Sequence, residues 1–170
     1  MRQIIYSAAA SLDGYIGRID GSADWIPEDP DIDFTSMFSR FDTVLLGRKT
    51  HDEALRLGGL APDLEAFVFS RTKPPGKRDG VGYVNSKPLE LVVELRKHPG
   101  KDLWLMGGGE LAAEFLEADL VDGIQMAVCP VVLGSGIPMF GRPAPERRFR
   151  LANQKVYPKS GIVMLDYERV

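Results

Sequence analysis

Three short segments carry groups that bind phosphate in proteins, and each directly follows an apolar run. They are Gly47–Thr50, Ser70–Thr72 and Gly107–Glu110. Glycine has no Cβ, so a ligand can approach the backbone closely, and free N–H groups at a helix start point toward an anion. Arg48 and Arg71 add guanidinium groups that can grip a third, ribose-linked phosphate. The three segments therefore favour NADPH, which has this phosphate, over NADH.

Strands and helices must bring these segments together. The apolar run 103–106 predicts a buried strand, and apolar residues at helical spacing follow over 111–116. The runs 43–46 and 65–69 predict two more strands, and a helix is expected over 51–57. In open α/β sheets, ligands bind at the carboxyl ends of strands, where helix N-termini converge. We therefore expect one sheet edge where two helix starts hold the two phosphates of a pyrophosphate.

The remaining pattern completes an α/β fold. A first strand is expected over 4–10, and helices are expected within 28–39, from about Pro30 onward, and over 88–97. Two late apolar runs, 149–156 and 162–167, flank a turn and predict an antiparallel hairpin. A weak strand over 81–84, a surface loop over 73–80 and a long strand over 121–133 are also expected. We predict one α/β domain over 1–170, with a central mixed, mostly parallel sheet, helices on both faces and a C-terminal antiparallel hairpin.

Composition narrows the class of protein. The chain has 170 residues, of which 44% are hydrophobic, and its net charge of −3 argues against nucleic-acid binding. One cysteine and two histidines give no disulfide and no zinc-type ligand spacing, so no metal site is predicted. Cys129 lies in an apolar run and is expected to be a buried, inert thiol. No stretch reaches the ~18 apolar residues of a membrane span, and the N-terminus is interpreted as a strand of a cytoplasmic protein.

The same motifs resemble those of a known family. Gly47–Thr50, Ser70–Arg71 and Trp104–Glu110 look like the cofactor motifs of the dihydrofolate reductase fold. More narrowly, Ser11–Gly17 and Pro130–Phe140 resemble the reductase domain of the bifunctional deaminase-reductase of riboflavin biosynthesis, and its stand-alone relatives. The resemblance covers nearly the whole chain and implies an NADPH-dependent reductase. The zinc deaminase signature is missing from the sequence, which excludes the deamination step.

The resemblance also implies where NADPH would lie. The first segment would hold the pyrophosphate and adenosine side, the second would meet the 2′-phosphate, and the third would pack on the pyrophosphate from the opposite side. A residue on the first strand and the backbone that follows it would lie beside the nicotinamide. The implied cofactor-binding residues are Ala8, Ile16, Gly17, Gly47, Arg48, Lys49, Thr50, Ser70, Arg71, Thr72, Gly107, Gly108, Gly109, Glu110 and Leu111.

For the substrate, the resemblance implies a flat heterocycle of pterin or pyrimidine type that accepts hydride at a C=N or C=O carbon. Dihydrofolate reductases carry a carboxylate on the first helix, and Asp31 and Asp33 are both candidates for this catalytic role. Asp33 is preferred because it is expected a turn inside the helix. Such a carboxylate would hydrogen-bond the substrate and raise the basicity of the accepting nitrogen. Trp25 and Phe34 are expected to stack on or enclose the substrate ring.

Other functions remain open from the sequence. One alternative is the 5-amino-6-(5-phosphoribosylamino)uracil reductase of riboflavin biosynthesis, although His51–Arg56 lacks the Asp-Pro-x-Leu-Thr-like pattern of that enzyme. Another is a protein that binds NADPH without catalysis, as a sensor or as a dimeric binding protein. The run 121–133 is apolar almost throughout, which predicts burial on both faces or a homodimer interface.

Overall fold

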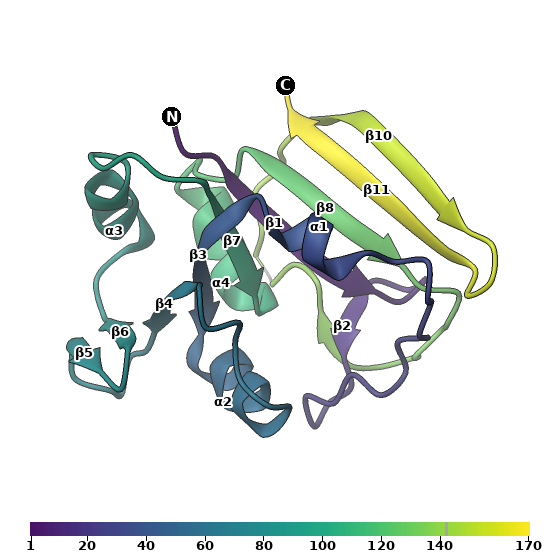
Figure 1. The fold of residues 1–170 in the computed structure, drawn as a ribbon, viewed down its shortest axis with the longest axis horizontal. Coiled ribbons are helices and arrows are strands. Elements are labelled where there is room, and N and C mark those ends of the chain that lie inside the picture. Colours follow the sequence, from purple (N-terminus) through teal and green to yellow (C-terminus); the bar gives the residue numbers. More distant parts are fainter. Residues whose placement is uncertain (142) are drawn as a thin grey trace.

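The computed structural model describes residues 1–141 and 143–170, and a large twisted sheet forms its centre (Figure 1). Within these residues the sheet has nine strands in the order β10-β11-β8-β1-β7-β3-β4-β6-β5, and β2 pairs with β9 beside it. The strands are β1 Ile4–Ala10, β2 Tyr15–Gly17, β3 Phe41–Gly47, β4 Glu65–Phe69, β5 Gly76–Arg78, β6 Val81–Val84, β7 Asp102–Gly107, β8 Gly123–Val128, β9 Ile137–Pro138, β10 Phe149–Tyr157 and β11 Ile162–Arg169. The helices are α1 Phe34–Phe38, α2 Arg48–Arg56, α3 Pro88–Leu95 and α4 Gly109–Glu117.

The central strands are parallel and the outer strands are antiparallel. β8, β1, β7, β3, β4 and β6 follow one another with parallel pairing, as crossover helices require. β11 then pairs antiparallel with both β8 and β10, and β5 pairs antiparallel with β6 at the other edge. The predicted mixed sheet with a C-terminal hairpin is confirmed.

Helices α3 and α4 bury one face of the central strands. The alternation along β7 sends Leu103 and Leu105 to this face, where they are fully buried. Phe115 of α4 and Val92 of α3 pack in the same core cluster. Figure 1 shows α4 behind β7 and β1. This packing fixes where α4 begins, and so it positions the third glycine segment.

Helices α1 and α2 lie on the opposite face. Trp104 of β7 points to this side, and Phe38 of α1 stacks on it with ring centroids 4.4 Å apart. Phe34 in turn stacks on Phe38 at 6.1 Å. Val44 and Leu46 of β3 are buried on this face, within a separate cluster. Helices thus lie on both faces of the sheet, as expected.

The first helix is much shorter than the sequence predicted. The pattern gave a helix within 28–39, from about Pro30 onward, but the helix spans only Phe34–Phe38. The buried carboxylate of Asp29 accepts hydrogen bonds from the backbone N–H of Asp31 and of Ser160, so it ties this stretch to the β10–β11 turn. Those backbone bonds hold the chain in a loop until Asp33.

Three other boundaries differ from expectation. The strand expected over 121–133 ends at Val128, because the chain then turns, with the Val131 N–H bonded to the carbonyl of Cys129. The expected surface loop 73–80 contains a short strand, β5, that pairs with β6. The helix expected over 51–57 begins earlier, at Arg48. No helix in the described part of the chain is long and apolar enough to cross a membrane.

Candidate dinucleotide site at the strand ends

Three neighbouring parallel strands end at the same level of one sheet edge. β3 lies between β7 and β4, with Leu46 opposite Gly107 and Gly47 opposite Phe69. The three segments predicted to bind phosphate begin at these ends, so residues far apart in sequence meet there. A Cβ placed on Gly47 would lie 3.8 Å from the carbonyl oxygen of Gly107, which shows how closely the two strand ends approach.

Two helices begin directly at this edge. The N-cap of α2 is Gly47 and the N-cap of α4 is Gly108, and among the described residues neither receives a side-chain capping bond. The first N–H groups of such helices are free to bind an anion, and the helix dipole adds positive potential there. The two helix starts stand on adjacent strands, which suits the two phosphates of one pyrophosphate.

The basic side chains surround this edge. Arg48 pairs with Asp52 one turn along α2, at 2.8 Å, and remains partly exposed. Arg71 is 92% exposed and lies 3.8 Å from the carboxylate of Glu110, itself 87% exposed. Lys49 is also exposed. These cations keep long, mobile side chains in water, where they can reach a phosphate.

The three consecutive glycines have three different surroundings. Gly107 has φ +102°, a backbone conformation that other residues rarely adopt. A Cβ on Gly109 would collide with the carbonyl oxygen of Pro138, so the protein's own backbone fills that space. A Cβ on Gly108 would meet only the Thr50 hydroxyl, at 3.6 Å. Gly108 is therefore the glycine that leaves room for a ligand. The peptide bond between Gly107 and Gly108 is cis.

Several other predicted residues lie near this edge with structural roles of their own. Ser70 is buried, and its hydroxyl accepts hydrogen bonds from the N–H groups of Thr72 and Lys73, which shapes the turn that carries Arg71. Leu111 is buried in the core under α4, so only its backbone can face a ligand. Gly108 caps the start of α4, and Thr50 lies in the first turn of α2.

Ala8, Ile16 and Gly17 lie at the end of β1 and in β2. Ala8 and Ile16 are partly buried and pack against the core cluster that α4 covers. Gly17 is buried, and a Cβ there would touch the backbone of Gly21 at 3.5 Å. Ala8 thus lies in the second half of β1, and β2, which carries Ile16 and Gly17, contacts β1.

The predicted carboxylates both have partners in the structure. Asp33 is the N-cap of α1, not an interior residue, and its side chain accepts a hydrogen bond of 2.9 Å from the Ser36 N–H. The expectation that Asp33 lies a turn inside the helix is wrong, because the loop before it is held open by Asp29. Asp31 pairs with Lys159 of the β10–β11 turn at 2.8 Å.

The two predicted substrate-stacking residues have contrasting environments. Trp25 is buried in a cluster with Cys129 and Met164, and within the described chain its indole N–H has no hydrogen-bond partner. Phe34 is exposed and forms the outer end of the aromatic stack on Trp104. Phe34 is therefore open to a ligand ring, whereas Trp25 supports the loop from inside.

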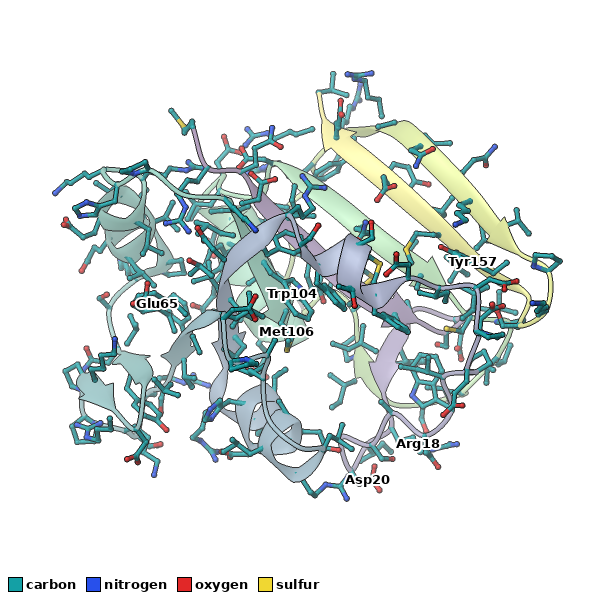
Figure 2. All side chains as sticks on the ribbon, viewed as in Figure 1. Arg18, Asp20, Glu65, Trp104, Met106 and Tyr157 are labelled. Carbon is teal, nitrogen blue, oxygen red and sulfur yellow. The ribbon has the colours of Figure 1, made fainter. Side chains whose placement is uncertain are left out.

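Sequence reasoning included Trp104 and Met106 in a cofactor motif but did not name their side chains as site residues. Trp104 and Met106 alternate with the buried leucines of β7, and they stay partly exposed on the face flanked by α1 and α2, at the centre of Figure 2. The indole of Trp104 donates a hydrogen bond of 3.1 Å to the carbonyl of Ser7. Because residues 103–106 are all apolar, the sequence did not indicate that Trp104 and Met106 would be less buried than Leu103 and Leu105.

Tyr6 was also missed. Its side chain is fully buried, and its hydroxyl donates a hydrogen bond of 2.6 Å to the carbonyl of Met139. Burial raises the pKa of Tyr6 above its ordinary value, so the hydroxyl remains a donor. The Gly141 N–H then bonds to the carbonyl of Gly109 at 2.8 Å. The segment 138–141 is thereby fixed against the start of α4.

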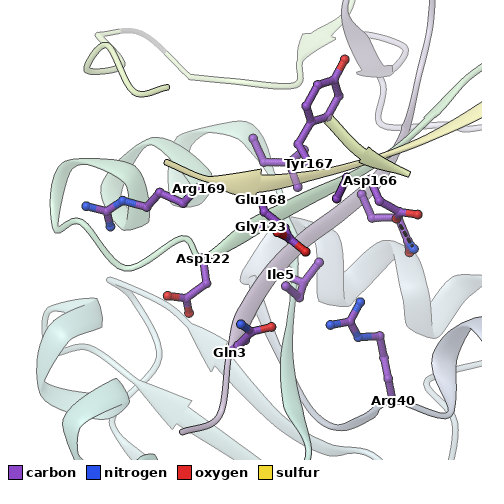
Figure 3. A pocket seen from close by; sticks show the side chains of 12 residues that line it. Gln3, Ile5, Arg40, Asp122, Gly123, Asp166, Tyr167, Glu168 and Arg169 are labelled. Atoms are coloured by element: carbon purple, nitrogen blue, oxygen red, sulfur yellow. Dashed lines mark hydrogen bonds between the residues drawn. The ribbon is translucent and has the colours of Figure 1, made fainter. Parts of the chain in front are cut away.

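Two cavities lie next to other parts of the sheet, and the first adjoins the segment 138–141 that packs on the start of α4. One, of about 540 Å³, is lined by residues that include Tyr15, Phe140 and Gly141. The other, of about 290 Å³, lies at the opposite end of β1 (Figure 3). There the buried Gln125 accepts from the Ser7 hydroxyl and donates to Asp166, which leaves its amide satisfied by the protein. The predicted cofactor residues line neither of these two cavities. Across residues 1–141 and 143–170, no group of three or more metal-ligating side chains converges.

The arrangement defines an α/β protein of the dihydrofolate reductase-like fold with a dinucleotide-type edge. The model of the RibD C-terminal domain matches residues 63–163, and the chain belongs to this family. The chain is 35% identical to the uncharacterised protein YyaP of Bacillus subtilis (strain 168), over 98% of this chain and 94% of YyaP.

Solved structures agree with this assignment. A Shewanella sp. PV-4 protein provisionally assigned to riboflavin biosynthesis superposes with a TM-score of 0.84 at 28% identity, over 100% of this chain and 99% of that one. The Thermotoga maritima diaminohydroxyphosphoribosylaminopyrimidine deaminase/5-amino-6-(5-phosphoribosylamino)uracil reductase gives a TM-score of 0.72 at 16% identity, over 99% of this chain and 57% of that one. The second likeness shows the fold alone.

Proposed function

We propose that this protein is an NADPH-dependent reductase that transfers a hydride to a small pyrimidine- or pterin-like heterocycle. The observation that carries the proposal is the meeting of two uncapped helix starts, at Gly47 and Gly108, beside the exposed Arg71. Membership of the RibD C-terminal domain family supports a reductase of this class.

The residues at the strand ends fit NADPH. The space over Gly108 lets a pyrophosphate approach the backbone, since only the Thr50 hydroxyl stands near it. The N–H groups that begin α2 and α4 would bind the phosphate oxygens, with Arg48 and Lys49 adding charge. Arg71 would pair with the 2′-phosphate, because guanidinium binds phosphate in a two-point geometry. NADPH, when bound, supplies the hydride from its nicotinamide ring.

The substrate would then lie over the face of β7 that carries Trp104 and Met106. Phe34 and the stack beneath it would hold one side of the ring by aromatic contact. Asp33 is the preferred carboxylate, because one of its oxygens caps α1 while the other can accept a hydrogen bond from the substrate. Asp31 remains the alternative carboxylate, and its partner Lys159 would have to be displaced.

For the substrate itself, the named alternative is 5-amino-6-(5-phosphoribosylamino)uracil. It is the reductase substrate in the name of the Thermotoga maritima protein, and the Shewanella protein is also assigned to riboflavin biosynthesis. The ring is a pyrimidine, so it belongs to the class proposed above.

The test is a titration of the purified protein with NADPH, followed by turnover assays. Trp25 and Trp104 are the chain's two tryptophans, so intrinsic fluorescence can report NADPH binding. A thermal shift is a second, independent measure of binding. Loss of absorbance from NADPH is then followed with dihydropterins, flavins and the uracil intermediate as substrates. Binding with oxidation by a heterocycle is expected.

Two outcomes would contradict parts of the proposal. If NADPH causes neither a fluorescence change nor a thermal shift, the cofactor assignment fails. If NADPH binds but no heterocycle oxidises it, the protein is a sensor and not a reductase.

A further inference from the structure

One tyrosine of the first strand contacts both the glycine turn after β7 and the segment 138–141. Tyr6 is fully buried in β1, which lies directly beside β7 (Figure 1). A Cβ on Gly107 would lie 3.4 Å from the Tyr6 ring, so the ring packs against the point where β7 ends. The Tyr6 hydroxyl donates a hydrogen bond of 2.6 Å to the Met139 carbonyl, and the ring meets Phe140 edge-on, with centroids 5.6 Å apart. Tyr6 therefore ties the end of β7 to the segment 138–141.

The segment 138–141 in turn joins two parts of the proposed cofactor site. On one side, the Met139 N–H donates a hydrogen bond of 2.9 Å to the Gly14 carbonyl, and β9 pairs with β2. On the other side, the Gly141 N–H donates a hydrogen bond of 2.8 Å to the Gly109 carbonyl in the first turn of α4. β2 carries residues expected beside the nicotinamide, and the start of α4 is expected to bind a phosphate. The segment thus fixes these two parts relative to each other.

The Tyr6 hydroxyl satisfies a carbonyl that is shielded from water. Met139 is 2% exposed, and in the described part of the chain the hydrogen bond to its carbonyl comes from Tyr6. A buried carbonyl that loses its donor costs free energy, so the backbone around it tends to shift toward another partner. Tyr6→Phe would keep the ring, and with it the packing against Gly107, and would remove the donor alone. The orientation of the segment therefore depends on one oxygen atom that can be deleted without opening a large cavity.

We propose that Tyr6 is a positioning residue of the cofactor site, and that its bond to Met139 holds the first turn of α4 in the orientation that binds the pyrophosphate. The inference rests on the proposed function, because it takes a dinucleotide to bind at the strand ends. N–H groups that already point toward a phosphate need little further ordering when the ligand arrives, and such preorganisation raises affinity. Gly109 has no free space on the side of Pro138, so the segment and the helix start must move together if the bond is lost.

This role concerns only one part of the cofactor. Arg71, which would bind the 2′-phosphate, follows β4, and β3 separates β4 from β7. Adenosine 2′-monophosphate carries that phosphate but no pyrophosphate, so its binding should not depend on Tyr6. NADH carries the pyrophosphate and the nicotinamide but no 2′-phosphate, so Tyr6 should matter as much for NADH as for NADPH. A general loss of folding would instead weaken the binding of all three ligands.

The test is a calorimetric titration of the wild type and of Tyr6→Phe with NADPH, NADH and adenosine 2′-monophosphate. Tyr6→Phe should bind both dinucleotides about threefold to tenfold more weakly, which is the range of one hydrogen bond of ordinary strength. It should bind adenosine 2′-monophosphate as the wild type does. In turnover with a heterocyclic substrate, KM for NADPH should rise by the same factor while kcat stays unchanged, because Tyr6 does not touch the reacting atoms.

Tyr157→Phe is the matched control. Tyr157 is also buried, but it lies on β10, and β11, β8 and β1 stand between that strand and β7. This variant should bind all three ligands as the wild type does. Phe140→Leu is a second, independent test, because it removes the ring that meets Tyr6 but keeps the Tyr6 hydroxyl. It should weaken the binding of both dinucleotides by a smaller factor and leave that of adenosine 2′-monophosphate unchanged.

Two results would overturn the inference and leave the proposed function in place. The first is unchanged dinucleotide binding by Tyr6→Phe. The second is equal weakening of all three ligands, since Tyr6 would then support the fold as a whole. If Tyr6→Phe does not fold, Phe140→Leu decides the question by the same pattern of the three ligands. If the wild type itself binds no NADPH, the proposed function fails, and the inference fails with it.

Discussion

The guanidinium of Arg71 lies 3.8 Å from the carboxylate of Glu110, although the first residue follows β4 and the second is in the first turn of α4. The pair spans the end of β3, where α2 begins, so a cation is held across the open edge that both helices face. Both side chains are largely exposed, and such pairs contribute little to stability. The pair therefore adds little stability, and under the proposed function Arg71 would exchange Glu110 for the 2′-phosphate.

The first prediction concerns cofactor choice. Arg71→Ala should weaken NADPH binding by about tenfold to a hundredfold, since hydrogen bonds to charged groups are worth roughly 1.5–3 kcal/mol. NADH binding should hardly change, because NADH has no 2′-phosphate. Fluorescence titration with both cofactors measures the difference. Arg150→Ala, at an exposed arginine on the far hairpin, is the control.

A substitution at Glu110 should change NADPH affinity in the opposite direction. Glu110→Gln removes a negative charge beside the proposed 2′-phosphate, so NADPH should bind more tightly than to the wild type. Equal losses for NADPH and NADH in Arg71→Ala, or no gain in Glu110→Gln, would show that Arg71 does not read the phosphate.

The second prediction separates two neighbouring glycines. Gly109→Ala should destabilise the fold by about 1–3 kcal/mol, as overpacking does, because the new Cβ meets the Pro138 carbonyl. Gly108→Ala should fold with nearly native stability, since φ is −75° and the nearest atom is 3.6 Å away. It should nevertheless lose NADPH affinity. Thermal unfolding and cofactor titration of both variants test these expectations. Normal NADPH binding by Gly108→Ala would contradict the proposed position of the pyrophosphate over Gly108.

The third prediction concerns the two candidate carboxylates. Asn caps a helix as well as Asp does, so Asp33→Asn keeps α1 intact and removes only the charge. Hydride transfer from NADPH should fall sharply in Asp33→Asn, with cofactor affinity unchanged. Asp31→Asn should lose the Lys159 pair with little effect on rate. Single-turnover rates measure both, and the reverse pattern would assign the role to Asp31.

The fourth prediction concerns acid stability. The Asp29 carboxylate accepts hydrogen bonds from Ser160 and from the backbone N–H of Asp31, and these bonds lower the pKa of Asp29 below its ordinary value. A carboxylate with a lowered pKa in the folded state stabilises the protein above its unfolded pKa of ~3.9. That contribution is lost as the pH falls below about 4. Urea midpoints between neutral pH and pH ~3 should therefore fall more steeply for wild type than for Asp29→Asn. Parallel curves would show that Asp29 does not carry the acid sensitivity.

The sequence alone was enough for the class of fold and for the motifs of the cofactor edge. The apolar run Leu103–Met106 is followed directly by glycines and then by apolar residues at helical spacing. This local order of residue types is enough to specify a strand, a turn and a helix. Because parallel strands place their carboxyl ends together, the three segments Gly47–Thr50, Ser70–Thr72 and Gly107–Glu110 had to meet. Their proposed role in binding NADPH still awaits the titrations above.

Only the tertiary structure decided which groups at that edge are free. The backbone of Pro138 occupies the space next to Gly109. Asp33 follows a loop in which Asp29 accepts a hydrogen bond from the backbone N–H of Ser160, a residue 131 positions away in the chain. Such contacts join distant segments through packing and single hydrogen bonds, and no local pattern of residue types encodes them.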